Sequence, residues 1–72
     1  MEKEIAKEVN SLVEEGIAKL NDALMFVKKH CDHEQYESFR NSIAYPIGYL
    51  DDVLDKHIYQ DHPELRPYDI DD

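Results

Sequence analysis

Apolar residues recur every three or four positions along two long stretches of the chain. In residues 3–29 the average step is about 3.67, close to the 3.6 residues of a helical turn, and the repeat comprises Ile5, Val9, Val13, Ile17, Leu20, Leu24 and Val27. In residues 33–60 the repeat comprises Tyr36, Phe39, Ile43, Ile47, Leu50, Val53, Leu54 and Ile58. This spacing predicts two amphipathic helices, each with one buried face.

The segment between the two stretches, residues 30–33, combines a helix stop with a helix start. Lys28 and His30 place basic side chains at a predicted helix C-terminus, where the helix dipole favours them. Asp32 is a good N-cap, and Gln35 follows at the spacing of a capping box. Because so short a connection makes long helices antiparallel neighbours, the sequence predicts an all-α helical hairpin.

The second predicted helix has Pro46 in its interior. Proline has no amide hydrogen to donate to the Ser42 carbonyl, and its ring crowds that turn. Two outcomes are open: a kinked continuous helix, or two helices broken near Tyr45. Because the apolar repeat continues across Pro46, we expect the kinked helix.

The chain after the second helix, residues 61–72, is expected to form an extended tail. Pro63 restricts the residue before it to non-helical angles and so ends the helix. We expect Leu65 and Tyr68 to fold back on the helix pair, and the last residues to fray. Residues 1–72 would then make one helical hairpin domain.

The apolar surface of the first helix is wider than one neighbouring helix requires. Leu12, Gly16, Ala23 and Phe26 extend it to roughly half of the helix circumference, against about 100° for a simple amphipathic helix. Gly16 destabilises a helix interior by roughly 1 kcal/mol relative to alanine, and with Ala23 it forms a smooth strip that another helix can approach. We therefore expect two hairpins to dimerise into a four-helix bundle with these four residues at the interface.

The length and cysteine content restrict what can reinforce the fold. A domain of 72 residues is marginally stable without reinforcement. Cys31 is the single cysteine, so no disulfide can form within the chain, and a metal site or self-association remains. The sequence has neither a signal-peptide pattern nor an apolar run of membrane-spanning length, and a lone thiol suits a reducing compartment. We expect a soluble cytoplasmic protein.

The formal net charge of −9 is unevenly distributed. Residues 1–30 contain five lysines and six acids, whereas residues 31–72 contain three basic residues and eleven acids. Such a field disfavours nucleic acid and anionic membranes as partners, and it favours a basic protein. The alternative is that the charge serves solubility alone.

Two groups of residues contain metal-ligating side chains. The first, His30, Cys31, Asp32 and His33, is contiguous and lacks the paired spacing of zinc modules. The second, His57 with Asp61, lies about 36 Å from the first along a helix. We expect these histidines to be solvent-exposed at helix ends, with no metal or cofactor bound.

The sequence offers little for catalysis. Cys31 lies in a tight polar turn that provides no pocket or oxyanion site. Asp51, Asp52 and Asp55 are expected on a solvated helix face, whereas acid–base pairs need a desolvated cleft. We expect no enzymatic activity.

A third group of residues favours protein binding. Tyr45, Tyr49, Asp52, Lys56 and Tyr59 follow one another at steps of four and three, which places them on one helix face opposite the apolar repeat. Tyrosines beside acids are typical of interface anchors. We expect a partner to bind there, with Asp51, Asp55 and Tyr68 also in contact. The alternative is that the tyrosines cover the dimer seam or the tail.

Three features of the second half of the chain are Phe39-Arg40, the aliphatic helix with Gly48, and His62-Pro63-Glu64-Leu65-Arg66-Pro67. They resemble the closing segment of many short uncharacterised bacterial proteins. A second motif, Leu65-Arg66-Pro67-Tyr68-Asp69 after an acidic helix, resembles the small acidic hairpin immunity proteins that neutralise toxins delivered by type VI secretion. That resemblance implies a dimeric hairpin that blocks a toxin by direct binding. The alternative function is a structural or regulatory homodimer without a toxin target.

Overall fold

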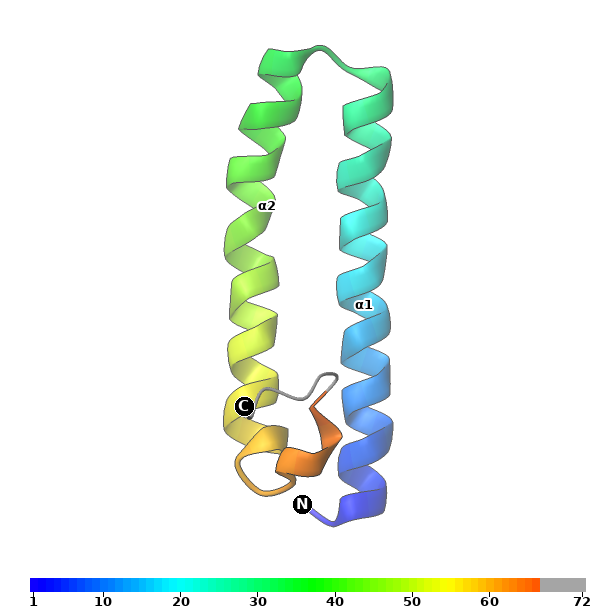
Figure 1. The fold of residues 1–72 in the computed structure, drawn as a ribbon, viewed down its shortest axis with the longest axis vertical. Helices are drawn as coiled ribbons and strands as arrows, with labels where there is room; N and C mark the ends of the chain where they lie inside the picture. Colours follow the sequence, from blue (N-terminus) through cyan, green and yellow to red (C-terminus); the bar gives the residue numbers. More distant parts are fainter. Residues whose placement is uncertain (67–72) are drawn as a thin grey trace.

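The computed structural model describes residues 1–66, which form two long antiparallel helices (Figure 1). Helix α1 spans Lys3–His30 and helix α2 spans His33–Leu54, so that Cys31 and Asp32 alone connect them. Residues 1–66 contain no strand. The predicted all-α helical hairpin is confirmed.

The turn has the predicted capping chemistry. Asp32 is the N-cap of α2, and its Oδ1 accepts a hydrogen bond of 2.8 Å from the Gln35 amide. On the other side of the turn, the Cys31 amide donates to the Val27 carbonyl at 2.9 Å. These two bonds satisfy backbone and side-chain groups at both helix ends, which allows the chain to reverse within two residues.

Helix α2 continues through Pro46 without a break, which confirms the continuous helix that the apolar repeat predicts, whereas the kink at Pro46 stays a prediction. After Leu54 the chain does not continue as a regular α-helix to residue 60. Instead, η1 (Asp55–Tyr59) is a π-helical turn, closed by a 3.2 Å bond from the Gln60 amide to the Asp55 carbonyl. Such a turn contains more residues than an α-helical turn, so each residue advances by less than 100° about the axis.

The chain then folds back towards α1 (Figure 1). A short 3₁₀ helix, η2, spans Pro63–Leu65, so the prediction of an extended tail is wrong for these residues. The reason is that Pro63 lies at the start of η2, where its fixed φ and missing amide hydrogen suit a helical turn. Leu65 packs against the buried residues, as predicted, whereas Tyr68 lies outside the described residues.

The fully buried side chains are concentrated at the end of the hairpin that carries η2. The cluster there consists of Ala6, Leu54, Ile58 and Tyr59, with Val9, Val13, Ile17 and Leu65 packed against it. Nearer the turn Ile43 is buried, but most apolar residues between the helices are only half-buried: Leu20, Leu24, Val27, Tyr36, Phe39, Ile47 and Leu50. Neither helix in residues 1–66 has the apolar length that a membrane crossing requires.

Candidate interaction surface

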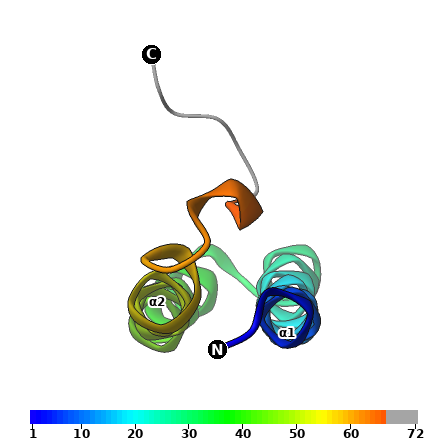
Figure 2. The ribbon, with the colours of Figure 1, turned by 90° about the horizontal axis from the view of Figure 1, so that it is seen from below.

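The two helices form one layer, and η2 lies on one side of it (Figure 2). Two contacts to α1 mark this side: the Tyr59 hydroxyl donates to Asn10 Oδ1 at 2.6 Å, and Lys3 Nζ lies 3.2 Å from Glu64 Oε2. We call this side the tail face. The opposite side of the layer, which no element of residues 1–66 covers, we call the bare face.

The bare face is rich in exposed apolar residues. At about 100° per residue, the side of α1 turned away from Asn10 carries Ile5, Leu12, Gly16, Ala23 and Phe26, and the matching side of α2 carries Pro46, Tyr49 and Val53. The side chain of Leu12 is 56 % exposed and that of Phe26 is 65 % exposed. All four residues predicted for a dimer interface therefore lie on one uncovered face.

Gly16 has no packing role within the hairpin. A Cβ atom at this position would meet no other atom within 4 Å. Its φ angle is ordinary, because the described residues contain no glycine with positive φ. The fold of a single copy therefore does not require glycine here, although glycine weakens a helix interior relative to alanine.

The outer side of α2 carries exposed tyrosines beside acids, as predicted. Tyr45 is 80 % exposed and Tyr49 is 70 % exposed, which makes them the most exposed large apolar side chains of the described residues. Asp52 is exposed nearby and forms an ion pair of 3.3 Å with Lys56, whereas Asp51 is exposed but lies about 160° round the helix from Tyr49, on the side of Asp55. Tyr49 lies at the border between this outer side and the bare face.

Tyr59 does not belong to this exposed surface, and the prediction that it does is wrong. Its side chain is only 8 % exposed, and its hydroxyl lies 3.3 Å from Glu14 Oε2 besides donating to Asn10. The cause is the π-helical turn, which advances each residue by less than 100° and so turns Tyr59 towards α1. No signal in the apolar repeat distinguishes this turn from a regular helix.

Asp55 is also engaged within the hairpin. Its Oδ1 forms a hydrogen-bonded ion pair of 2.9 Å with Arg66, and the guanidinium of Arg66 lies 5.6 Å from the centre of the Tyr59 ring. Arg66 therefore connects the tail to η1 and to the ring of Tyr59 in the buried cluster. A basic partner would have to compete with Arg66 for this carboxylate.

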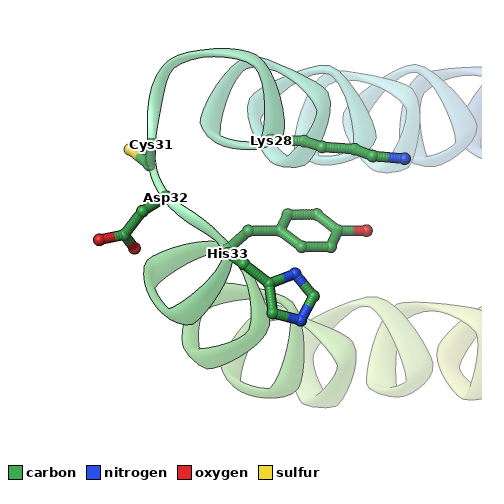
Figure 3. Close-up of a pocket in the computed structure, with 5 residues that line it drawn as sticks. Lys28, Cys31, Asp32 and His33 are labelled. Atoms are coloured by element: carbon green, nitrogen blue, oxygen red, sulfur yellow. The ribbon is translucent and has the colours of Figure 1, made fainter.

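A shallow hollow of about 420 Å³ lies at the turn, lined by Lys28, Cys31, Asp32, His33 and Tyr36. Figure 3 shows that the side chains of Cys31 and Asp32 point outward, away from the His33 ring and the Lys28 ammonium. Within residues 1–66, no three His, Cys, Asp or Glu side chains lie close enough together to hold a metal ion. The hollow thus has no convergent set of ligands or nucleophiles.

Two surface carboxylates have lowered pKa values. A hydrogen bond from Arg40 at 2.8 Å lowers the pKa of Glu37, with a smaller contribution from the positive charges of Arg40 and His33. A hydrogen bond to its own backbone amide lowers the pKa of Glu64, and Lys3 lowers it further. The first carboxylate lies near the turn and the second lies in η2, so each end of the hairpin has one.

No protein-family model, curated protein or solved structure matches the chain. Inference about function therefore depends on the surfaces of the hairpin: the bare face and the outer side of α2.

Proposed function

We propose that the chain is a protein-interaction module that acts as a homodimer, in which two hairpins form a four-helix bundle. The main support is the bare face, where Leu12 and Phe26 are exposed above a core that is only half-buried towards the turn. Two helices in one layer cannot enclose the side chains between them, and a stable core requires a second packed layer. A second hairpin on the bare face supplies that layer.

In this proposal the outer side of α2 binds a basic protein and blocks it by direct contact, as the immunity proteins that the chain resembles do. Exposed tyrosines such as Tyr45 and Tyr49 provide large contact areas, and they are enriched among residues that dominate binding energy. Asp51 and Asp52 attract a basic partner and mainly increase its association rate. Because Tyr59 is buried and Asp55 is paired, the proposed surface is smaller than the sequence predicted.

One observation favours the alternative, a structural or regulatory homodimer that binds nothing else. Tyr49 lies at the border of the bare face, where a second hairpin would meet it. If the tyrosines contact the second copy, their exposure in a single hairpin reflects self-assembly alone.

The dimer is tested by sedimentation of two matched variants. The wild-type protein is expected to sediment at twice the chain mass of 8.5 kDa at micromolar concentration. Leu12→Glu should convert it to monomers, because a carboxylate cannot be buried unpaired. Met25→Glu is the control, since Met25 is 51 % exposed, much like Leu12 at 56 %, but lies on the tail-face side of α1. A monomeric wild type, or equal effects of both substitutions, would contradict the proposal.

The partner surface is tested by affinity capture from the native lysate, identification of the captured protein, and measurement of its binding once purified. Tyr49→Ala should weaken binding by about 2 kcal/mol or more, whereas Asp51→Asn with Asp52→Asn should weaken it less and reduce its salt dependence. Met25→Ala should have no effect. If Tyr49→Ala also abolishes the dimer, the tyrosines belong to self-assembly and the alternative function holds.

A further inference from the structure

We infer that the two hairpins of the dimer lie with their turns at opposite ends, so that α1 packs antiparallel against α1 of the second copy with Gly16 near the twofold axis. The inference depends on the proposed dimer and specifies its arrangement. It also names the occupant of the bare face, which is a second copy of this chain.

The size of the bare face suits a second hairpin. Helix α1 has 28 residues, which gives a length of about 42 Å, and two helices side by side are about 20 Å wide. The face therefore offers about 800 Å², which is what each partner contributes to a protein–protein interface of standard size.

Two arrangements with twofold symmetry bring the bare faces together. If the turns lie at the same end, α1 of one copy faces α2 of the other. If the turns lie at opposite ends, α1 faces α1 and α2 faces α2. Facing helices are antiparallel in both cases, so the helix dipoles do not distinguish the two arrangements.

The distribution of charge does distinguish them. The half of the hairpin away from the turn, residues 1–16 and 48–66, contains ten acids and four basic residues, a net charge of −6. The half that includes the turn, residues 17–47, contains four acids and four basic residues, a net charge of zero. Packed helices lie about 8–10 Å apart, which is within or near the screening length at physiological salt. Turns at the same end would therefore place two halves of charge −6 against each other, whereas turns at opposite ends place each against a neutral half.

The position of Gly16 agrees with the second arrangement. Gly16 lies at the middle of α1, between Lys3 and His30, so a twofold axis through the centre of the face brings the Gly16 residues of both copies together. A Cβ at Gly16 meets nothing within one hairpin. Its absence matters only if another helix approaches there, and glycine allows the closest approach of two backbones.

The single cysteine allows a direct test of the arrangement. Cys31 is exposed, lies in the turn and points outward (Figure 3), so a spin label attached to it marks the turn of each copy. Dipolar spectroscopy of the labelled full chain should give a distance of about 40 Å or more, because the labels lie at opposite ends of helices about 42 Å long. A distance below about 25 Å would overturn the inference but leave the dimer intact, because turns at the same end are separated only by packed helices.

A second labelling site distinguishes failure of the arrangement from failure of the dimer. In Cys31→Ser with Ala18→Cys, the label lies near the middle of α1 and away from the bare face, so both arrangements give a short distance of about 25 Å or less. A short distance here with a long distance at Cys31 supports the inference. Absence of dipolar coupling at both sites, in a protein that sediments as a monomer, would overturn both the inference and the proposed dimer.

The close approach at Gly16 has its own test in a matched pair of variants. Gly16→Leu should raise the dissociation constant of the dimer by about tenfold or more, which is a loss large enough to measure by sedimentation. Ala18→Leu places the same side chain on an exposed residue about 160° round α1 from Gly16, on the side that carries Met25, and should leave the dissociation constant unchanged. Equal dissociation constants for the two variants would contradict a helix contact at Gly16.

Discussion

The two ends of the hairpin differ in how their apolar residues are enclosed. At the tail end, η2 and the π-helical turn add a third element to the helix pair, and Leu54, Ile58 and Tyr59 are buried. At the turn end the helices contact only each other, and side chains such as Leu24 stay half-buried. The comparison indicates that a helix pair buries side chains only along its line of contact, and that a further element is needed to complete a core.

The tail end is also held by polar contacts between distant parts of the chain. His62 Nε2 lies 2.9 Å from the Met1 carbonyl oxygen, and Lys3 forms an ion pair of 3.2 Å with Glu64. The turn end depends instead on local interactions, such as the N-cap bond of Asp32. Substitutions at the two ends should therefore differ both in size and in mechanism.

The largest expected difference is between two leucine truncations. Leu54→Ala should reduce the free energy of unfolding by about 2–5 kcal/mol, because it leaves a cavity at a fully buried position among buried and half-buried neighbours. Leu24→Ala should reduce the free energy of unfolding by less than Leu54→Ala at low protein concentration, since Leu24 is only half-buried in a single hairpin. Urea denaturation of both variants at several concentrations tests this. Equal losses at the lowest concentration would contradict the difference in enclosure.

The turn end was predictable because its determinants are local in the sequence. The apolar repeat predicts both helices, and Asp32 with Gln35 predicts the cap that the structure contains. The tail end was less predictable, because a π-helical turn at Asp55–Tyr59 leaves no mark in a pattern of apolar positions. The burial of Tyr59 follows from that turn and from contacts with Asn10, which lies 49 positions away in sequence.

The exposure of most residues of the proposed interaction surface was also predictable from the sequence. The excess width of the apolar arc on α1 identified Leu12, Gly16, Ala23 and Phe26, and all four are exposed in the structure. Tyr45 and Tyr49 were correctly placed because Pro46 leaves α2 continuous and its angular positions regular. Asp55 was assigned to the open surface because nothing in the sequence indicates that Arg66 folds back to it.

A smaller effect is expected from removal of the cap at the turn. Asp32→Ala should reduce the free energy of unfolding by about 1 kcal/mol, because the Gln35 amide loses its acceptor. Loss of an N-cap typically costs about 0.5–2 kcal/mol of stability. Asp32→Asn keeps a side-chain oxygen at the same position and should cost far less. Thermal or urea unfolding measures both. An equal loss in the two variants would indicate that charge, and not the capping bond, stabilises the turn.

At the tail end, removal of the Tyr59 hydroxyl should reduce the free energy of unfolding by about as much as loss of the Asp32 cap, or slightly less. Tyr59→Phe keeps the buried ring and removes the bond to Asn10, which should cost about 0.5–1.5 kcal/mol. Tyr49→Phe makes the same chemical change on a side chain that is 70 % exposed, and it should leave the free energy of unfolding almost unchanged. Denaturation of the two variants side by side measures the difference. A loss at Tyr49 as large as that at Tyr59 would contradict the assignment of Tyr59 to the core.

The smallest expected effects are those of pH on Glu37 near the turn and Glu64 in the tail. Both have pKa values below their ordinary value, so each favours folding above the ordinary glutamate range, and this contribution is lost as pH falls through the pKa of the folded state. The causes of the two lowered pKa values differ: Arg40 is the main cause for Glu37, whereas the backbone amide of Glu64 is the main cause for Glu64.

NMR titration of two variants tests these causes. The pKa of Glu37 should rise most of the way to its ordinary value in Arg40→Gln. The pKa of Glu64 should rise less in Lys3→Gln, because the hydrogen bond from the backbone amide of Glu64 to its own carboxylate remains. If the pKa of Glu64 returned fully to its ordinary value in Lys3→Gln, the ion pair with α1, and not the local geometry of η2, would be the main cause of its lowered pKa.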